Sequence, residues 1–526
     1  MNESHQISRR HLLGGAAVVA GSLALGGKHS VLAQSISAQS IPATPQPGGS
    51  LSVAGSIDIT DPDPQISNLL NHHYLAWEGL TGVTASGELK PMLAETYEAS
   101  DDATTYTFTL RQGVKFQNGR DLTADDVKWS LDRIKDPGTR AFRGNDLKDV
   151  TIEVVDSQTV RLTSSTPNAA LPAALASCFI LAPESVDDDG KINGGIGTGP
   201  FVFQSWTPET ETRFTRNPNY WMPGLPYLDE VVYQVIADSD ARLTALRSQT
   251  IDIGSALPTL QLPLIAGDSS IVTQQTTANI SAHLTFNWSN LQAPLDDIRV
   301  RQAIAYALNK QDLLTATVGT DGPGIVNNQL ASPDDFWRLA VDDPFATPDL
   351  DQAKALLAEA GQDGGFSVSL VAWDVRRAPA EVIKEQLGEI GIDVELIFPP
   401  DFTSYLTELQ ANKYHLLYDE SYPRDDPAYL FTFFDSANEQ NIYYGTYGNP
   451  DVDAKLSEAI ATADPDQRRA AYAAALQTLE NEDISSLFTT SRRDVWGNLA
   501  RVQNFVLGAG QLHRIDGGLA VTWLAS

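Results

Sequence analysis

The chain has 526 residues, with 36 Lys and Arg against 67 Asp and Glu, so its formal net charge is −31 at pH 7. At about 100–200 residues per domain, this length predicts two to four domains. So large an excess of negative charge repels phosphate groups, which excludes non-specific nucleic-acid binding and argues against docking on anionic lipid. Cys178 is the single cysteine, so neither an intramolecular disulfide nor a CxxC metal site can form.

The first part of the chain has the pattern of an export signal. Arg9 and Arg10 precede an uncharged run over 12–25, which is shorter than the roughly 20 apolar residues that span a bilayer. With the small-residue exit at Ala33, this pattern predicts a cleaved secretory signal over 1–33. The paired arginines resemble a twin-arginine signal, which exports folded proteins; an ordinary secretory signal is the alternative. Residues 34–49 are rich in Ser, Pro, Gln and Gly and predict a flexible leader.

No cysteine directly follows the apolar run, so no lipid attachment is expected. No later run is long and apolar enough to span a membrane, so we expect no membrane insertion after the signal is cleaved.

The stretch from about 50 to 285 has a mixed pattern with many strands. Apolar residues alternate with threonines over 105–110, which indicates a half-buried strand. Thr123 is predicted to cap a helix that presents Val127, Leu131 and Ile134 on one face. The pattern over 152–162 predicts a hairpin that turns at Asp156 and Ser157.

From about 345 to 418 the pattern changes to alternating helices and strands. Strands are predicted around 366–370, 394–398 and 416–418. A helix ending at Gly361 precedes the first strand, a helix starting at Pro379 precedes the second, and a short helix around 406–409 precedes the third. This βαβαβ order predicts three parallel strands in a doubly wound sheet.

Ligands of open parallel sheets bind beyond the carboxyl ends of the strands. Three loops are expected there, at 372–378, 399–402 and 419–427. They combine charges of both signs with aromatic rings, which suits a small polar ligand; solvated loop charges are the alternative. The side chains concerned are Trp373, Arg376, Arg377, Asp401, Phe402, Asp419, Glu420, Tyr422, Arg424, Asp425 and Asp426.

Catalytic and cofactor signatures are missing from the sequence. It contains no HExxH, GxSxG, P-loop or GxGxxG motif. His72 and His73 are adjacent, which is a weak signal for a metal pair because neighbours on a strand point to opposite faces. We therefore expect no catalytic residue, no metal and no cofactor.

Six segments in order resemble the extracytoplasmic solute-binding proteins of family 5, the dipeptide, oligopeptide and nickel group that serves ABC transporters. The most specific is YTFTLRQGVKFQN at 106–118, followed by LTADDV at 122–127. The others are LAETYE at 93–98, GTGPF at 197–201, RNPNYW at 216–221, RLTAL at 242–246 and DIRVRQAI at 297–304.

The resemblance implies an α/β fold of the two-lobed periplasmic-binding-protein type II-like class (cluster C), with an extra subdomain in the first lobe. The implied ranges are 50–284 for the first lobe with the subdomain at about 82–196, 285–487 for the second lobe, and 488–526 returning to the first. Hinge strands are implied at 284–287 and 487–489.

The implied function is capture of a peptide-like or other small polar solute between the lobes and its delivery to a membrane permease. The partners would be the permease and ATPase subunits of one ABC importer, with this chain acting as an extracytoplasmic monomer. The alternatives are an exported hydrolase on the same frame and a chemosensory binding protein.

The ligand is less clear from the resemblance. Peptide binders of the family hold the peptide amine with an aspartate whose place here is taken by Pro423, so Asp419 or Asp425 is the candidate substitute. Arg376 and Arg377 are the candidates for holding a carboxylate, and Asn287, at the end of the implied hinge strand, joins the predicted ligand-binding set. Peptides, opines, sugars and nickel chelates all stay open as ligands.

Overall fold

The computed structural model describes residues 45–67, 72–276, 280–320, 322–329, 331, 336–400, 402–421, 426–431, 433–508 and 511–525. The predicted signal and most of the predicted leader lie outside these residues. Residues from Pro45 to Ser526 form one compact unit.

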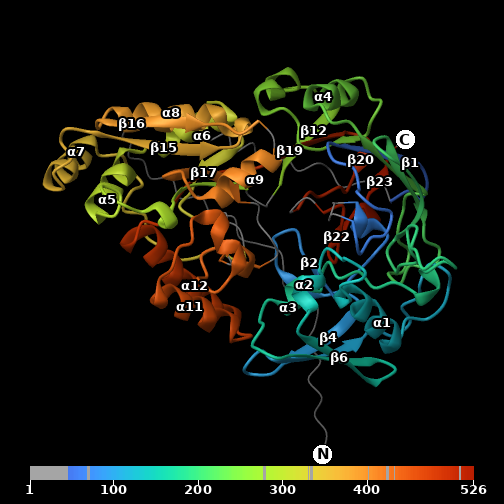
Figure 1. Ribbon diagram of the computed structural model, residues 1–526. Helices are drawn as coiled ribbons and strands as arrows, with labels where there is room; N and C mark the ends of the chain where they lie inside the picture. The colour runs from blue at the N-terminus through green and yellow to red at the C-terminus, as the bar shows by residue number, and fades with distance from the viewer. Residues whose placement is uncertain are drawn as a thin grey trace, which may run out of the picture. The chain divides into compact units, whose positions relative to one another are not determined.

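A seven-stranded mixed sheet is built from both ends of this unit (Figure 1). Its order is β12-β19-β11-β1-β10-β9-β8, in which β1 runs parallel to β10 and β11 and the other pairs are antiparallel. The strands are β1 (Ser50–Gly55), β8 (Phe201–Thr207), β9 (Glu211–Arg216), β10 (Glu230–Val235), β11 (Ile253–Gly254), β12 (Ile271–Gln275) and β19 (Val495–Leu499), with α4 (Ser239–Arg247) beside β11.

A four-stranded antiparallel sheet forms inside the range predicted for the subdomain. Its order is β4-β5-β7-β6, and α1 (Ala124–Lys135) packs on it. The strands are β4 (Ala94–Ala99), β5 (Thr105–Leu110), β6 (Val150–Asp156) and β7 (Thr159–Ser164). The predicted hairpin and helix are confirmed. Thr123 starts α1 with its N–H donating to the Asp126 carboxylate over 2.9 Å.

Short elements join and extend these sheets. They are β2 (Thr81–Val83), β3 (Leu89–Pro91), α2 (Gly144–Leu147), α3 (Leu171–Ala174), β20 (Val502–Gln503), β21 (His513–Arg514), β22 (Gly517–Gly518) and β23 (Trp523–Leu524). The C-terminal segment packs back on the early part of the chain, where the His513 ring lies 3.3 Å from the Glu78 carboxylate.

A six-stranded sheet contains the predicted βαβαβ region. Its order is β14-β18-β13-β17-β15-β16. The strands are β13 (Ile280–Phe286), β14 (Gly324–Val326), β15 (Phe366–Ala372), β16 (Ile392–Ile397), β17 (Leu416–Ser421) and β18 (Ser486–Arg492). β15 pairs in parallel with both β16 and β17, so the prediction of three parallel strands is confirmed.

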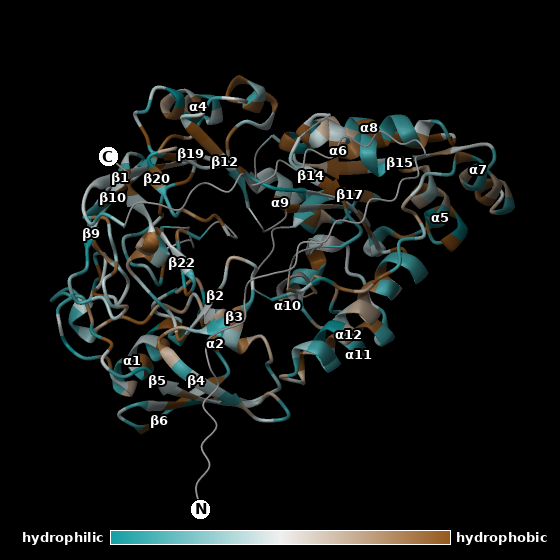
Figure 2. Cartoon of the chain, turned by 180° about the vertical axis from the view of Figure 1, so that it is seen from behind, coloured by the Kyte–Doolittle hydropathy of each residue, from teal (hydrophilic) through white to brown (hydrophobic). Residues whose placement is uncertain are grey.

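Helices cover both faces of this sheet, as expected for a doubly wound arrangement (Figure 1). Leu370 and Ala372 pack in one apolar cluster, whereas Val371 between them packs in another on the opposite face. The first face is covered by α5 (Ile298–Ala307), α6 (Lys310–Val318), α7 (Leu350–Glu359) and α8 (Arg377–Gly388). The second is covered by α9 (Phe402–Ala411), α11 (Pro450–Ile460) and α12 (Pro465–Gln477), with α10 (Ala428–Phe431) nearby. The outward sides of α11 and α12 are mainly hydrophilic (Figure 2).

The chain passes between the two large sheets at two places. It leaves the seven-stranded sheet after β12 and returns to it between β18 and β19. The two crossings touch, because the Thr276 N–H donates to the Asp494 carbonyl over 2.9 Å. The segments implied as hinge strands, 284–287 and 487–489, lie at the end of β13 and within β18, which pair with each other. The division into lobes at 284 and 487 stays a prediction.

Candidate functional site

The loop after β15 leads directly into α8 and places two arginines at the start of that helix. A short 3₁₀ turn covers Asp374–Arg376, and α8 begins at Arg377, two residues before the predicted start. Pro379 fits inside the first turn because the first N–H groups of a helix have no partner within it. Cations at a helix N-terminus oppose the helix dipole, so both arginines need anions beside them.

The anions beside Arg376 come from β17, the strand parallel to β15. Its side chain is 6% exposed, and Nη1 lies 3.1 Å from the Asp419 carboxylate. Nε lies 3.5 Å from the Glu420 carboxylate, and the guanidinium lies 5.6 Å from the centre of the Trp373 ring. The carboxyl ends of β15 and β17 therefore bring four of the predicted site residues together.

The ion pairs continue onto β18 and the crossing that follows it. Arg492 Nε lies 3.1 Å from the Glu420 carboxylate, and Arg492 Nη1 lies 3.1 Å from the Asp494 carboxylate. We call Arg376, Asp419, Glu420, Arg492 and Asp494 the charge network. Its cations and anions alternate, so each charge has an opposite charge beside it.

A buried histidine lies beside this network on β13. His283 Nε2 is 3.0 Å from the Ser421 hydroxyl, and Nδ1 is 2.9 Å from the Thr285 hydroxyl. Burial, followed by the charge of Arg376, lowers the pKa of His283 to about 3, so the ring is neutral at pH 7. Burial also raises the pKa of Asp419, while the Arg376 cation opposes that rise.

Two predicted residues are not brought into the network. Arg377 is half exposed, donates from Nε to Asp374 over 2.9 Å, and lies 3.9 Å over the Phe398 ring. Asn287 is at the opposite end of β17 from Ser421, because β13 and β17 are antiparallel. Its amide donates to the Tyr414 carbonyl and accepts from the Ser289 N–H, which is a local structural role.

Part of the predicted loop at 419–427 lies outside the described residues. This applies to Tyr422, Arg424 and Asp425, and also to Asp401 in the neighbouring loop. Asp426 is described, and its carboxylate forms a buried ion pair with Arg468, with two contacts of 2.7 Å. Asp426 also accepts from the Ala428 N–H over 3.0 Å, at the start of α10.

Sequence reasoning missed His283, Ser421, Arg492 and Asp494. Their sequence signal is weak: a single histidine within a strand, a serine at the end of another strand, and charges that directly follow the Ser- and Thr-rich stretch at 486–491. Among the described residues, no group of three His, Cys, Asp or Glu side chains is arranged to hold a metal ion. The described helices include none that is long and apolar enough to cross a bilayer.

A comparison with known protein families identifies the family of this chain. The model of bacterial extracellular solute-binding proteins, family 5, matches residues 88–441, which is more than half of the chain. The chain belongs to this family. The resemblance found in the six sequence segments is thereby confirmed.

Named relatives of the chain are binding proteins. The glutathione-binding protein of Salmonella typhi is 30% identical over 417 residues, which are 75% of this chain and 79% of the relative. The glutathione-binding protein of Escherichia coli K12 is 29% identical over 429 residues, 77% of this chain and 81% of the relative.

Solved structures confirm the two-lobed fold class. HbpA2 from Haemophilus parasuis has a TM-score of 0.79 at 24% identity, covering 91% of this chain and all of that one, which shows the fold alone. The binding protein AgaA of A. tumefaciens R10, solved with agropinic acid, has a TM-score of 0.71 at 28% identity. That comparison covers 91% of this chain and 99% of AgaA.

Proposed function

We propose that this chain is the substrate-binding component of an ABC importer and that it captures a short peptide-like zwitterion. The observation that carries the proposal is the contact of Arg376 with Asp419 at the carboxyl ends of β15 and β17. One cation and one anion held together there offer partners for both ends of a zwitterion. The glutathione-binding relatives make glutathione the first ligand to test.

The mechanism is a shift of population between open and closed arrangements. A solute that contacts both lobes stabilises the closed arrangement by its differential affinity for it. In the absence of solute, the charge network holds Arg376 and Asp419 in place by pairing them with each other. A zwitterion inserts its carboxylate toward Arg376 and its ammonium toward Asp419, and so replaces one ion pair with two.

The experiment is thermal unfolding of the purified chain against a panel of solutes. The panel holds glutathione, dipeptides, tripeptides, opines, oligosaccharides and nickel chelates. A ligand at 100 times its dissociation constant stabilises by about 2.7 kcal/mol, which raises the midpoint by a few degrees. We expect glutathione or another short peptide to raise it. A rise with opines, sugars or chelates alone would overturn the peptide assignment.

Blocked ligands and matched variants test the two ends separately. Arg376→Ala is expected to weaken the binding of a peptide by about 1.5–3 kcal/mol, the range for hydrogen bonds to charged groups. It should weaken the binding of the same peptide with an amidated C-terminus much less. Asp419→Asn is expected to weaken the binding of the free peptide more than the binding of its N-acetylated form. Arg377→Ala is the control, since its side chain pairs with Asp374 outside the network. Equal binding by Arg376→Ala and the parent chain would remove Arg376 from the site.

We further propose that the chain acts as a monomer outside the cytoplasm and is delivered there by a twin-arginine signal. The family match and the binding-protein relatives support the extracytoplasmic location. Arg9 and Arg10 support the export route. Light scattering of the purified protein tests the monomer, with a mass near 56.9 kDa, less the signal, as the expected result.

A further inference from the structure

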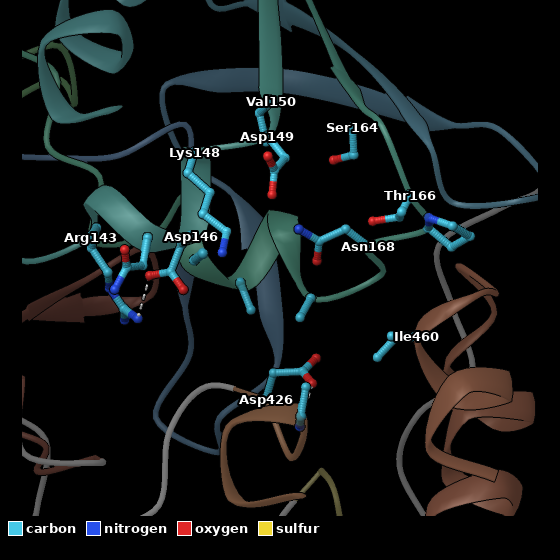
Figure 3. A pocket seen from close by; sticks show the side chains of 16 residues that line it. Arg143, Asp146, Lys148, Asp149, Val150, Ser164, Thr166, Asn168, Asp426 and Ile460 are labelled. Atoms are coloured by element: carbon cyan, nitrogen blue, oxygen red, sulfur yellow. Dashed lines mark hydrogen bonds and ion pairs between the residues drawn. The ribbon is translucent and has the colours of Figure 1, made fainter. Parts of the chain in front are cut away.

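A cavity of about 340 Å³ lies where the four-stranded subdomain meets the start of α10 and the end of α11 (Figure 3). One wall comes from residues 143–174, and the other comes from Asp426, Ala428 and Ile460. The walls are joined directly, because the Ala169 N–H donates to the Ile460 carbonyl over 3.0 Å. None of the residues of the charge network lines this cavity.

Two of the charged pairs at the cavity are satisfied within the protein. Arg143 Nη1 lies 3.2 Å from the Asp146 carboxylate, and Asp426 is held by Arg468. The charges within each pair therefore compensate each other, so these groups attract a charged ligand only weakly.

Five further polar side chains face the cavity and have no partner within the part of the chain that the structure describes. The side chains of Lys148, Asp149, Thr166 and Asn168 point toward the same space in Figure 3, and within the described part of the chain they make no side-chain hydrogen bond or ion pair. The Ser164 hydroxyl also faces it. Ser164 is 7% exposed, and its hydroxyl has no hydrogen-bond partner among the described residues. A buried hydroxyl without a partner is costly, so this one indicates a group that completes it.

We propose that this cavity is a second binding site, for a zwitterion of amino-acid size. Among the described residues neither Lys148 nor Asp149 has an ion-pair partner, so Lys148 offers a cation for a carboxylate and Asp149 offers an anion for an ammonium. Ser164, Thr166 and Asn168 supply neutral hydrogen-bonding groups between them. The volume is at the lower end of the range of roughly 300–1,000 Å³ for small-molecule sites.

Other classes of ligand fit the cavity less well. An anion such as phosphate would face the carboxylate of Asp149, which has no counter-charge among the described residues. A metal ion would need three suitable ligands, and no such group occurs among the described residues. A zwitterion matches both unpaired charges at once.

The site also has a consequence for closure. Its walls belong to segments more than 250 residues apart in sequence, Ser164 and Asp426 among them. A solute that touches both walls stabilises their contact, and by linkage it raises the affinity for a solute captured between closed lobes.

The test is isothermal titration of the purified chain with single free amino acids, using L-alanine and L-glutamine as the probes. We expect saturable binding of at least one probe, with the dissociation constant raised at least tenfold in Lys148→Met and in Asp149→Asn. Both positions are exposed, so neither variant should fail to fold. Arg377→Met is the control, because its exposed side chain belongs to neither the cavity nor the charge network, and it should bind the probe as the parent does.

Three outcomes would overturn the proposal. They are no binding of either probe, equal binding by the parent chain and both cavity variants, and loss of binding in Arg376→Met with retention in Lys148→Met. The last outcome would assign the amino acid to the charge network. Because peptide binding is measured with different ligands, failure of the second site leaves the proposed importer function untouched.

Discussion

Arg376 is a buried cation that lies between two carboxylates. Removing one partner of a buried ion pair leaves the other charge without compensation, which costs more than the pair contributes while it is intact. The helix N-terminus of α8 gives no help to Arg376, because its partial positive charge repels the guanidinium. The stability of this edge of the sheet therefore depends on Asp419 and Glu420 remaining beside Arg376.

Arg376→Met is expected to lower the free energy of unfolding by about 3–5 kcal/mol, because Asp419 loses its buried counter-charge. Urea unfolding at pH 7 measures this difference. Arg377→Met is the matched control and should change it by less than about 0.5 kcal/mol, as for other exposed sites. If both variants unfold like the parent chain, the network contributes nothing to stability.

His283 predicts a pH dependence whose sign follows from its lowered pKa. The unfolded ring protonates near its ordinary value of about 6.5, whereas the folded ring stays neutral down to about 3. Between these values the unfolded state binds more protons, so the free energy of unfolding falls as the pH falls. We expect His283→Asn to flatten the decline between pH 6.5 and 3. Parallel curves for the variant and the parent chain would exclude this contribution.

At the scale of elements, strand β18 contains a β-bulge beside which one backbone N–H donates to a side chain from outside the sheet. The register with β13 shifts between Ala282 and His283, so Thr489 is the extra residue. Its hydroxyl donates to the Ala282 carbonyl over 3.1 Å. The neighbouring Phe488 N–H donates instead to the buried Glu480 carboxyl over 2.7 Å. Glu480 comes from a π-helical turn, Thr478–Glu482, that continues α12.

Glu480→Ala is expected to lower the free energy of unfolding by about 1–3 kcal/mol, because the Phe488 N–H is left buried without an acceptor. Burial raises the pKa of Glu480 well above its ordinary value, while the Lys310 cation and the hydrogen bond from the Phe488 N–H oppose that rise. Glu480→Gln keeps an acceptor of the same shape and should cost much less than the alanine variant. Chemical denaturation of the two variants decides the matter, and equal losses would show that the negative charge matters instead.

At the scale of the whole molecule, export is predicted to depend on the paired arginines near the start of the chain. The double variant Arg9→Lys with Arg10→Lys keeps the positive charge of the segment but removes the pair that the twin-arginine route reads. It should accumulate inside the cell with its signal uncleaved, and immunoblotting of cell fractions gives the readout. Lys28→Arg is the control, because it changes a cation beyond the uncharged run and should be exported normally. Normal export of the double variant would favour an ordinary secretory signal.

The elements that the sequence predicts well depend on neighbours in the chain. Alternation at 105–110 and 366–370 follows from the period of a strand, and the two patterns appear in the structure within β5 and β15. The end of a helix near Gly361 is also predicted, because glycine commonly terminates helices. In the structure Gly361 has a φ of +71°, a conformation that glycine adopts readily. These patterns depend only on residues close together in the sequence, so they predict secondary structure without knowledge of the tertiary contacts.

The errors concern a helix boundary and contacts that the sequence pattern does not encode. The predicted start of α8 at Pro379 is two residues late, because the preceding turn continues smoothly into the helix. Asn287 lies away from Asp419, because antiparallel pairing of β13 with β17 places them toward different ends of the strands, and its role in ligand binding stays a prediction. Arg377 does not join Arg376, since consecutive residues at a helix start point in different directions.

Local sequence patterns were enough to establish the family, the parallel strands and the edge of the sheet at which charged loops gather. They could not establish that Arg376, Asp419, Glu420 and Arg492 pair with one another, because those contacts join residues from three segments of the sheet. Nor could they reveal the cavity beside Ser164, whose walls meet only when distant segments pack. The physical reason is that strand and helix periods are properties of neighbouring residues, whereas ion pairs and cavities depend on strand order, register and closure.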